Sequence, residues 1–291
     1  MSNYVKLLKT DKQFELLKSP TDLSSEISPE EAKEKLKSLR KKIAKIQDVM
    51  YAHNKYNVLI CFQGMDTAGK DSLIRELFKE FNARGVEVSS FKTPSTKELQ
   101  HDYLWRHAIA LPARGKFGVF NRTHYENVLV SRVHPEYLLN ENLPFIVELK
   151  DIPEDLWKQR YTQINNFEKH LTDNGTILFK FYLHLSKDEQ KNRLLRRLEK
   201  EKHNWKFSPG DLAERKLWDK YMLAYQEAIQ HTSKAKAPWF CIPADDKDIA
   251  RYLVAKIIYD TLKKYTDIQY PELDDAIQDD IKKYKNHLSE S

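Results

Sequence analysis

The sequence predicts an α/β fold with a mostly parallel sheet of five strands and helices on both faces. Short apolar runs alternate with helical patterns along the chain, which favours parallel strands joined by crossover helices. The run at 56–63 is continuously apolar, as expected for a strand buried on both faces. A glycine-containing loop pattern follows this run directly, and a helical pattern follows the loop.

Each element has its own signal in the sequence. The expected strands lie at 56–63, 86–91, 116–121, 176–185 and 238–243. Ser28 before Pro29 predicts the start of a charged helix that runs to about residue 54. The helix after the loop is expected to end near Gly85. Later helices are expected between Pro153 and Gly175 and over 247–265.

These elements divide the chain into three parts. Residues 1–54 are expected to form an N-terminal segment, irregular up to residue 28, and a helix that packs on the core. Residues 55–270 form the main domain, with a lid at about 188–221. Residues 271–291 form a polar tail that is expected to fold back as a helix.

The composition sets broad limits on the function. The 291 residues carry 49 Lys and Arg against 43 Asp and Glu, a net charge of +6. This excess is milder than that of most nucleic-acid binders and is compatible with an anionic substrate in a local groove. Cys61 and Cys241 lie in apolar runs and are expected to be buried. No signal-peptide pattern and no membrane-length apolar run is found, so a cytoplasmic protein is expected.

The loop at 64–72 predicts a phosphate site. Gly64, Gly69 and Lys70 have the spacing of the G-x-x-x-x-G-K loop, in which backbone N–H groups and a helix N-terminus surround phosphate oxygens. The expected phosphate-binding residues of this loop are Gly64, Thr67, Ala68, Gly69, Lys70, Asp71 and Ser72.

Two acids distinguish this loop from the common pattern. Asp71 stands where Ser or Thr usually ligates Mg²⁺; it either ligates a metal or caps the following helix, and we favour the cap. Ser72 could then supply part of the missing role. Asp66 lies inside the loop, where it either holds Mg²⁺, orients the attacking group or closes a turn. We favour a functional role because the loop must lie close to its ligand.

A second segment with site residues follows the strand at 116–121. Phosphate-loop enzymes usually place a metal-binding Asp here, but this chain has Asn121 followed by Arg122, which can clamp a phosphate. Glu126 could restore the missing carboxylate. His124 and His134 are interpreted as packing or surface residues.

A third segment carries Arg193, Arg196, Arg197 and Lys200 at adjoining helical positions. Such a run is usually a solvated face, but its place after the fourth strand also suits a basic lid over transferring phosphates. Thr93 and Pro94, after the second strand, either line a nucleotide pocket or belong to an ordinary loop.

Together these segments resemble one family. The stretches GMDTAGKDS, FKTPS, LPARGKFGVFNRTHYENVLVSRVHP, HNWKFSPGDLAERKLWDKYMLAYQEAI and APWFCIPADDKDIARYLVAKII are similar to polyphosphate kinase 2 over about residues 30–265. The resemblance implies reversible phosphoryl transfer between inorganic polyphosphate and a nucleotide, with Mg²⁺ or Mn²⁺. It also implies a P-loop kinase-type three-layer sandwich with a helical lid.

The resemblance assigns roles to the site residues. It implies catalytic roles for Asp66, Lys70 and Arg122, and a metal held by Asp66 and Glu126. Arg193 and Arg197 are expected to bind phosphate. The expected nucleotide-binding residues are Thr93, Pro94, Asn121, Arg122 and Glu126. Asn121 in FNRTHYE resembles the class III subgroup, which implies that both AMP and ADP are accepted. The expected partners are polyphosphate and adenine or guanine nucleotides in a homo-oligomer, with no nucleic acid and no membrane.

Three other functions are alternatives for this sequence. An ATP-dependent nucleotide or nucleoside kinase would share the fold, the loop and the lid. A GTPase switch would need an N-K-x-D motif after a later strand, and none is found; NKYN at 54–57 precedes the loop. A nucleic-acid-binding protein is disfavoured because no recognised motif of that class is present.

Overall fold

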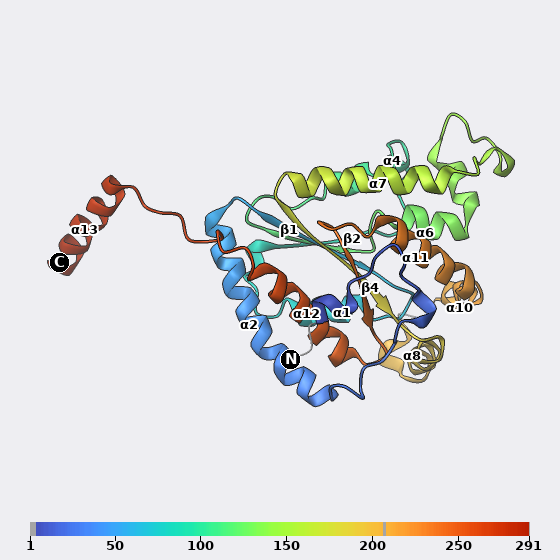
Figure 1. The fold of residues 1–291 in the computed structure, drawn as a ribbon, viewed down its shortest axis with the longest axis horizontal. Helices are drawn as coiled ribbons and strands as arrows, with labels where there is room; N and C mark the ends of the chain where they lie inside the picture. The colour runs from blue at the N-terminus through green and yellow to red at the C-terminus, as the bar shows by residue number, and fades with distance from the viewer. Residues whose placement is uncertain (1–3, 206–207, 291) are drawn as a thin grey trace.

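The chain folds around one parallel sheet. A computed structural model describes residues 4–205 and 208–290. The strands are β1 (Asn57–Gln63), β2 (Val86–Ser90), β3 (Phe117–Asn121), β4 (Thr176–His184) and β5 (Trp239–Pro243), in the order β2-β3-β1-β4-β5 (Figure 1). All four strand pairings are parallel. The five predicted strands and their orientation are therefore confirmed.

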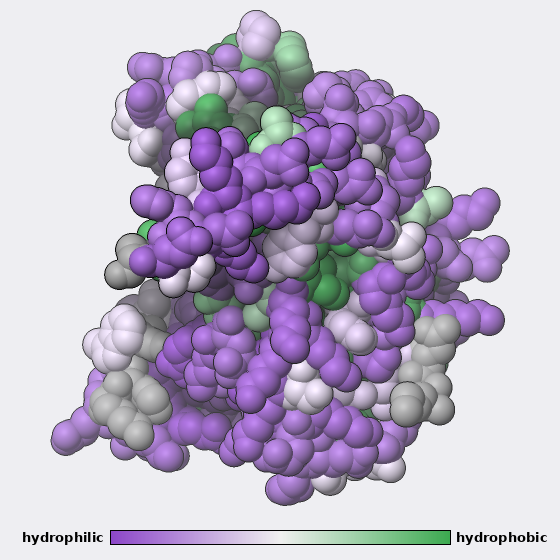
Figure 2. Space-filling view, turned by 90° about the vertical axis from the view of Figure 1, so that its left-hand side faces the viewer, coloured by the Kyte–Doolittle hydropathy of each residue, from purple (hydrophilic) through white to green (hydrophobic). Residues whose placement is uncertain are grey.

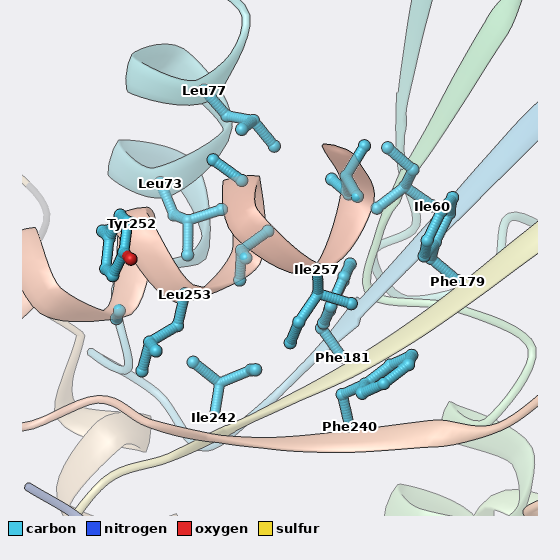
Figure 3. Close-up of a cluster of buried hydrophobic side chains, with 14 of the residues drawn as sticks. Ile60, Leu73, Leu77, Phe179, Phe181, Phe240, Ile242, Tyr252, Leu253 and Ile257 are labelled. Atoms are coloured by element: carbon cyan, nitrogen blue, oxygen red, sulfur yellow. The ribbon is translucent and has the colours of Figure 1, made fainter. Parts of the chain in front are cut away.

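Helices cover both faces of the sheet. One face is covered by α2 (Pro29–His53), α3 (Lys70–Leu77) and α12 (Lys247–Leu262), and the other by α6 (Glu126–Val133), α7 (Leu156–Asp173) and α11 (Trp218–Thr232). Figure 3 shows Ile60 and Phe181 of the sheet pointing toward Leu253 and Ile257 of α12. Every residue of β1 and β4 is buried, because helices lie on both sides of the central strands. The predicted three-layer α/β architecture is confirmed.

The start of α2 follows its sequence signals. The Ser28 hydroxyl accepts a hydrogen bond from the backbone N–H of Glu31 at 3.1 Å, and Pro29 occupies the first helical position. The residues before it are less irregular than predicted. They contain helix α1 (Tyr4–Leu8) and a 3₁₀ turn at Leu16–Lys18, and Leu16 is fully buried.

The helix after the phosphate loop is shorter than predicted. It ends at Leu77, and Gly85 belongs instead to a 3₁₀ turn at Ala83–Gly85. A Cβ atom on Gly85 would lie 1.9 Å from Nε2 of Gln47. A side chain at this position would displace the Gln47 amide, which donates to the Asn82 carbonyl and accepts from the Asn82 N–H, both at 3.0 Å. The predicted helix cap at Gly85 is wrong. The other short elements are α4 (Thr96–Leu99), α5 (Trp105–Ala108) and 3₁₀ turns at Pro135–Glu141 and Leu149–Asp151.

The predicted lid segment is helical. It contains α8 (Lys187–Glu199), α9 (Glu201–Asn204) and α10 (Pro209–Lys216). Residues 206 and 207 of the predicted lid lie outside the described residues. Helix α13 (Asp275–Glu290) confirms a helix in the tail, but the expectation that it folds back is wrong. All residues at 271–290 are exposed, and Figure 1 shows α13 set apart from the body.

The exterior of the protein is mainly polar. Hydrophilic residues cover most of the face drawn in Figure 2, and hydrophobic residues show there only as small patches. Within residues 4–205 and 208–290, no helix is long and apolar enough to cross a membrane.

Candidate active site

The phosphate-type loop joins β1 to α3 at the carboxyl end of the sheet. Gly69 has φ of +101° and is the N-cap of α3, a conformation that favours glycine. Gly64 has no room for a side chain, because a Cβ atom would lie 2.9 Å from the carbonyl oxygen of Leu183. Thr67 adopts φ of +67°. Non-glycine residues in this region are strained, and such strain is concentrated at functional sites.

Lys70 lies across its own loop. Its Nζ donates to the carbonyl oxygen of Gly64 at 2.6 Å. Burial lowers the pKa of Lys70, and the positive charge of Arg122 lowers it further, although Asp66 opposes this. A phosphate group bound in the loop would favour the charged form of the lysine.

Arg122 brings the two predicted metal ligands together. It follows β3 with φ of +62°, and its guanidinium donates to Asp66 Oδ1 at 2.9 Å and to Glu126 Oε2 at 3.3 Å. The negative charge of Glu126 raises the pKa of Arg122, so the guanidinium stays charged. The loop, the end of β3 and the start of α6 thus meet at one cationic group.

Asp71 and Asn121 form a second link between α3 and β3. Asn121 Nδ2 donates to Asp71 Oδ1 at 2.5 Å. Asp71 lies in the first turn of α3, where an acid is favourable, as expected. Its carboxylate, however, accepts a hydrogen bond from Asn121, so the expectation that it caps a backbone N–H is not met. This hydrogen bond fixes the side chain of Asn121, which stands where phosphate-loop enzymes usually place a metal-binding Asp.

Two cavities open from this centre. The first has a volume of about 880 Å³. Its lining contains two acids, Asp66 and Asp71, and seven cationic residues: Lys70, Lys92, Arg122, Arg193, Arg196, Arg197 and Lys247. Such a charge ratio suits a polyanion.

The second cavity has a volume of about 460 Å³ and the opposite balance of charge. Three cationic residues line it, Lys92, Arg106 and Arg122, against seven acidic ones: Asp66, Glu98, Asp102, Glu126, Glu141, Asp211 and Glu214. Phe91, Tyr103, Tyr137 and Tyr221 add aromatic rings to the wall. The two cavities share part of their lining: Asp66, Phe91, Lys92, Thr93 and Arg122. The ion pair of Asp66 and Arg122 therefore lies where the two spaces meet.

Arg193 lines the first cavity, but its N–H groups donate to other atoms of the protein. Its Nε donates to Glu189, one terminal nitrogen donates to the carbonyl oxygens of Thr67 and Ala68, and the other to those of Ala244 and Asp245. These five bonds use all five N–H groups of the side chain. Arg193 therefore positions the phosphate loop against α8, and only its charge remains to act on a phosphate.

Most of the predicted site residues lie together. Thr67, Gly69, Lys70, Asp71, Ser72, Thr93, Asn121, Arg122, Arg193 and Arg197 line the first cavity. Thr93, Pro94, Arg122 and Glu126 line the second. Gly64 and Ala68 are buried. Sequence reasoning missed Lys92 and Lys247. The available signal was their place just beyond the carboxyl ends of β2 and β5, where ligands bind in open α/β sheets.

The acidic residues of the site determine whether a divalent cation fits it. Within the described residues, no group of three or more His, Cys, Asp or Glu could hold a metal by itself. Asp66 and Glu126 instead supply two carboxylates that converge on Arg122. Mg²⁺ is commonly bound by one or two carboxylates together with substrate phosphates and water. The residues present fit an ion of this kind that is completed by substrate oxygens.

The comparison with known proteins identifies the family. Residues 26–270 match the family model described as Polyphosphate kinase 2. The chain belongs to the polyphosphate kinase 2 family. It is 44% identical over 261 residues to an ADP-polyphosphate phosphotransferase of Rhodopseudomonas palustris, an alignment that covers 90% of this chain and 89% of the relative.

Two further proteins support the assignment to polyphosphate kinase 2. An AMP/ADP-polyphosphate phosphotransferase of Meiothermus ruber is 41% identical over 271 residues, which cover 92% of this chain and 96% of the relative. The crystal structure of polyphosphate kinase 2 from Arthrobacter aurescens TC1 is 32% identical and superposes with a TM-score of 0.88. That match covers 100% of this chain and 98% of the other. The fold predicted from the resemblance is confirmed.

Proposed function

We propose that this enzyme transfers the terminal phosphoryl group of inorganic polyphosphate reversibly to AMP and ADP. The observation that carries the proposal is the meeting of two cavities of opposite charge at Asp66 and Arg122. A long polyanion fits the cationic cavity, and a nucleotide fits the smaller cavity with its aromatic and acidic wall. Their reacting ends then meet at the shared ion pair.

The reaction needs no covalent enzyme intermediate. A terminal phosphate oxygen of the nucleotide attacks the terminal phosphorus of the polymer in line. A new P–O bond forms to the nucleotide, and the bond to the next phosphate of the polymer breaks. The shortened polymer leaves with the electron pair as a phosphate oxyanion. In this assignment Lys70 and Arg122 are catalytic, because they stabilise the charge on the transferring group.

The role assigned to the acids follows from the same geometry. Asp66 and Glu126 orient Arg122 through the bonds at 2.9 and 3.3 Å. They are also the residues that would hold Mg²⁺, or Mn²⁺, which would offset the repulsion between the two phosphate chains when bound. Asp66 therefore has two roles in the proposal, one toward the arginine and one toward the ion.

Further properties belong to the same proposal. Thr93, Pro94 and Glu126, which line the second cavity, contact the nucleotide, whereas Asn121 lines the first cavity and is assigned to the polymer. Acceptance of guanine as well as adenine nucleotides is proposed. Arg197 contacts the polymer. The enzyme acts in the cytoplasm as a homo-oligomer, without nucleic-acid or membrane partners.

The deciding experiment supplies polyphosphate as the only phosphoryl donor and varies the acceptor nucleotide. Purified protein is incubated with long-chain polyphosphate and Mg²⁺, with AMP in one tube and ADP in another, and without ATP. Ion-exchange chromatography should detect ADP and ATP formed from AMP, and ATP formed from ADP. Conversion of ADP alone would contradict the use of AMP. Product that forms only when ATP is added as donor would replace the proposal with an ATP-dependent nucleotide kinase.

A further inference from the structure

The carbonyl oxygens of the phosphate loop, from residue 64 to residue 68, are held by hydrogen bonds within the protein. The donors are Lys70 Nζ for Gly64, the backbone N–H of Ala68 for Met65, Gln190 Nε2 for Asp66, and Arg193 for Thr67 and Ala68. A phosphate oxygen is attracted by a backbone N–H and repelled by a backbone carbonyl oxygen. The groups that hold these carbonyl oxygens therefore decide which side of each peptide faces the ligand.

Gln190 holds the carbonyl oxygen of the acid inside the loop. This residue lies on α8 and is 1% exposed. Its Nε2 donates to the backbone oxygen of Asp66 at 3.1 Å, and its Oε1 accepts from Arg215 of α10 at 2.9 Å. A guanidinium can only donate and a carbonyl oxygen can only accept, so the amide has a single orientation. Gln190 thus links α10 to the peptide that joins Asp66 to Thr67.

The peptide that Gln190 holds is under conformational strain. Thr67 has φ of +67°, a region that disfavours residues other than glycine. The peptide bond is trans, so the Thr67 N–H points opposite to the Asp66 carbonyl group. A rotation of this peptide by about half a turn would return φ of Thr67 to negative values and would exchange the directions of the two groups. Without the bond to Gln190, the relaxed peptide would turn the Asp66 carbonyl oxygen toward the first cavity, which Thr67 lines.

We propose that Gln190 is a positioning residue for phosphoryl transfer, which holds the peptide after Asp66 with its N–H group toward the phosphates. The inference rests on the proposed function, because it takes the first cavity to be the site of the polymer. Gln190 does not line that cavity and acts through the loop. The same hydrogen bond fixes the backbone of Asp66, whose carboxylate pairs with Arg122 at 2.9 Å. Loss of the bond should therefore disturb both the phosphate site and this ion pair.

Arg215 makes the position of the loop depend on α10. Its guanidinium also donates to the carbonyl oxygen of Lys187 at 2.6 Å, so it joins α10 to the start of α8. Asp211 and Glu214 of α10 line the second cavity. A displacement of α10 would leave the Gln190 amide without the partner that orients it. The phosphate loop is thus fully formed only while α10 stays packed on α8.

Binding of inorganic tripolyphosphate with Mg²⁺, measured by isothermal titration calorimetry without nucleotide, tests the role of Gln190 apart from catalysis. Gln190→Met keeps the length of the side chain but removes the donor. The dissociation constant should rise about 10-fold, which corresponds to one hydrogen bond. Gln47→Met is the matched control, because Gln47 is also buried and exchanges two hydrogen bonds with the Asn82 backbone, but lines neither cavity. The dissociation constant of this control should change less than about 2-fold.

Replacing Thr67 with glycine tests the strain argument directly. Glycine adopts positive φ values readily, so the peptide depends less on the hydrogen bond from Gln190. In the Thr67→Gly background, Gln190→Met should weaken tripolyphosphate binding by less than about 3-fold rather than about 10-fold. An effect of the same size in both backgrounds would mean that Gln190 does not hold a strained peptide, and would overturn the proposal.

A second pair of variants tests the same link from α10. Arg215→Met leaves the donor of Gln190 in place but removes the group that orients it, and tripolyphosphate affinity should fall about 5-fold. Lys216→Met removes the same charge from the next position, which is exposed, and should change the affinity less than about 2-fold. Equal effects of the two substitutions would overturn the link through Arg215. This pair decides the question even if Gln190→Met does not fold.

Turnover gives a readout that a general loss of stability would not produce. With polyphosphate and AMP, Gln190→Met should lower kcat at least about 10-fold while the KM for AMP changes less than about 3-fold, because Gln190 does not line the second cavity. Wild-type affinity and kcat in this variant, or equal losses in Gln47→Met, would overturn the proposal. A wild-type protein that does not bind tripolyphosphate would refute the placement of the polymer in the first cavity, whereas binding that is insensitive to Gln190→Met would refute the role of Gln190 alone.

Discussion

Replacing Lys180 with methionine should strongly destabilise the protein. Lys180 lies in the middle of β4 with no exposed surface, and its ammonium donates to Glu168 at 2.6 Å, to the Tyr125 hydroxyl at 2.9 Å and to the Thr232 carbonyl at 2.8 Å. The other Glu168 oxygen is hydrogen-bonded to Tyr125 and His124. The substitution would leave the Glu168 carboxylate buried without its cation.

The expected loss of unfolding free energy is about 3–5 kcal/mol, the usual cost of removing one partner of a buried ion pair. Burial alone would raise the pKa of Glu168, but Lys180 and His124 outweigh it and hold the pKa below its ordinary value. A carboxyl group of this kind contributes stability above its unfolded pKa of about 4.3, and the contribution is lost as the pH falls through the folded pKa. The difference between wild type and variant should therefore be largest near neutral pH and should shrink in acid.

Equilibrium unfolding in urea, followed by both tryptophan fluorescence and circular dichroism, measures this loss. Lys169→Met is the matched control, because Lys169 pairs with Asp173 on α7 but its side chain is 73% exposed. That variant should lose less than about 1 kcal/mol. Adding Glu168→Gln to Lys180→Met should cost less than the sum of the two single substitutions, since the second change removes the unpaired charge.

Two results would refute the reasoning. A loss below about 1 kcal/mol for Lys180→Met would mean that Glu168 finds another cation or water at no cost. Strict additivity of the double variant would mean that the two charges do not act as a pair.

Four further predictions concern the site and its rim. Lys70→Ala should lower kcat/KM at least about 100-fold, and turnover like that of wild type would remove the loop from the mechanism. Asp66→Asn should abolish transfer while changing unfolding free energy by less than about 1 kcal/mol; an unfolded variant would make the residue structural. Arg197→Ala should raise the KM for polyphosphate or lower kcat, and unchanged kinetics would contradict a lid role. Burial opposes protonation of His134, but Glu214 outweighs it and the pKa of His134 is raised. His134→Gln should therefore lose most stability below about pH 6.5, and the loss should disappear as the pH rises through the raised pKa; a loss that is independent of pH would contradict this ion pair.

The sheet was predictable because its signal is local. Each strand is a short apolar run, and burial on both faces leaves no other pattern for the central strands. The end of α3 was not predictable from the same signal. Phe78 and Phe81 continue the helical spacing beyond Leu77, yet they lie outside the helix and pack on the sheet, with the rings of Phe81 and Phe117 5.4 Å apart. The spacing of Phe78 and Phe81 indicates that their side chains are buried, and residues outside a helix can be buried as well.

Site residues that belong to a sequence motif could be predicted. Roles that depend on contacts with residues elsewhere in the chain could not. The loop pattern located Lys70, and the end of β3 located Arg122. The arginines of α8 gave no signal to distinguish Arg193 from Arg197. Their roles differ because Arg193 alone of these two meets the carbonyl oxygens of the loop, whereas Arg197 pairs with Asp211 of α10 at 2.5 Å. Such contacts join residues that are far apart in the sequence.

In the proposed assignment, the charges lining the two cavities separate the polymer from the nucleotide. Seven cationic residues against two acids attract a polymer that carries a charge on every phosphate. Six of the seven acids of the second cavity are ion-paired with Arg106, Arg122, His134, Arg160 or Arg197, so this cavity offers a polyphosphate few cations that are not already engaged. A nucleotide can place its neutral base and ribose there and present only its terminal phosphate to Arg122. In the proposed arrangement the donor and the acceptor therefore reach Arg122 from different cavities, as in-line transfer requires.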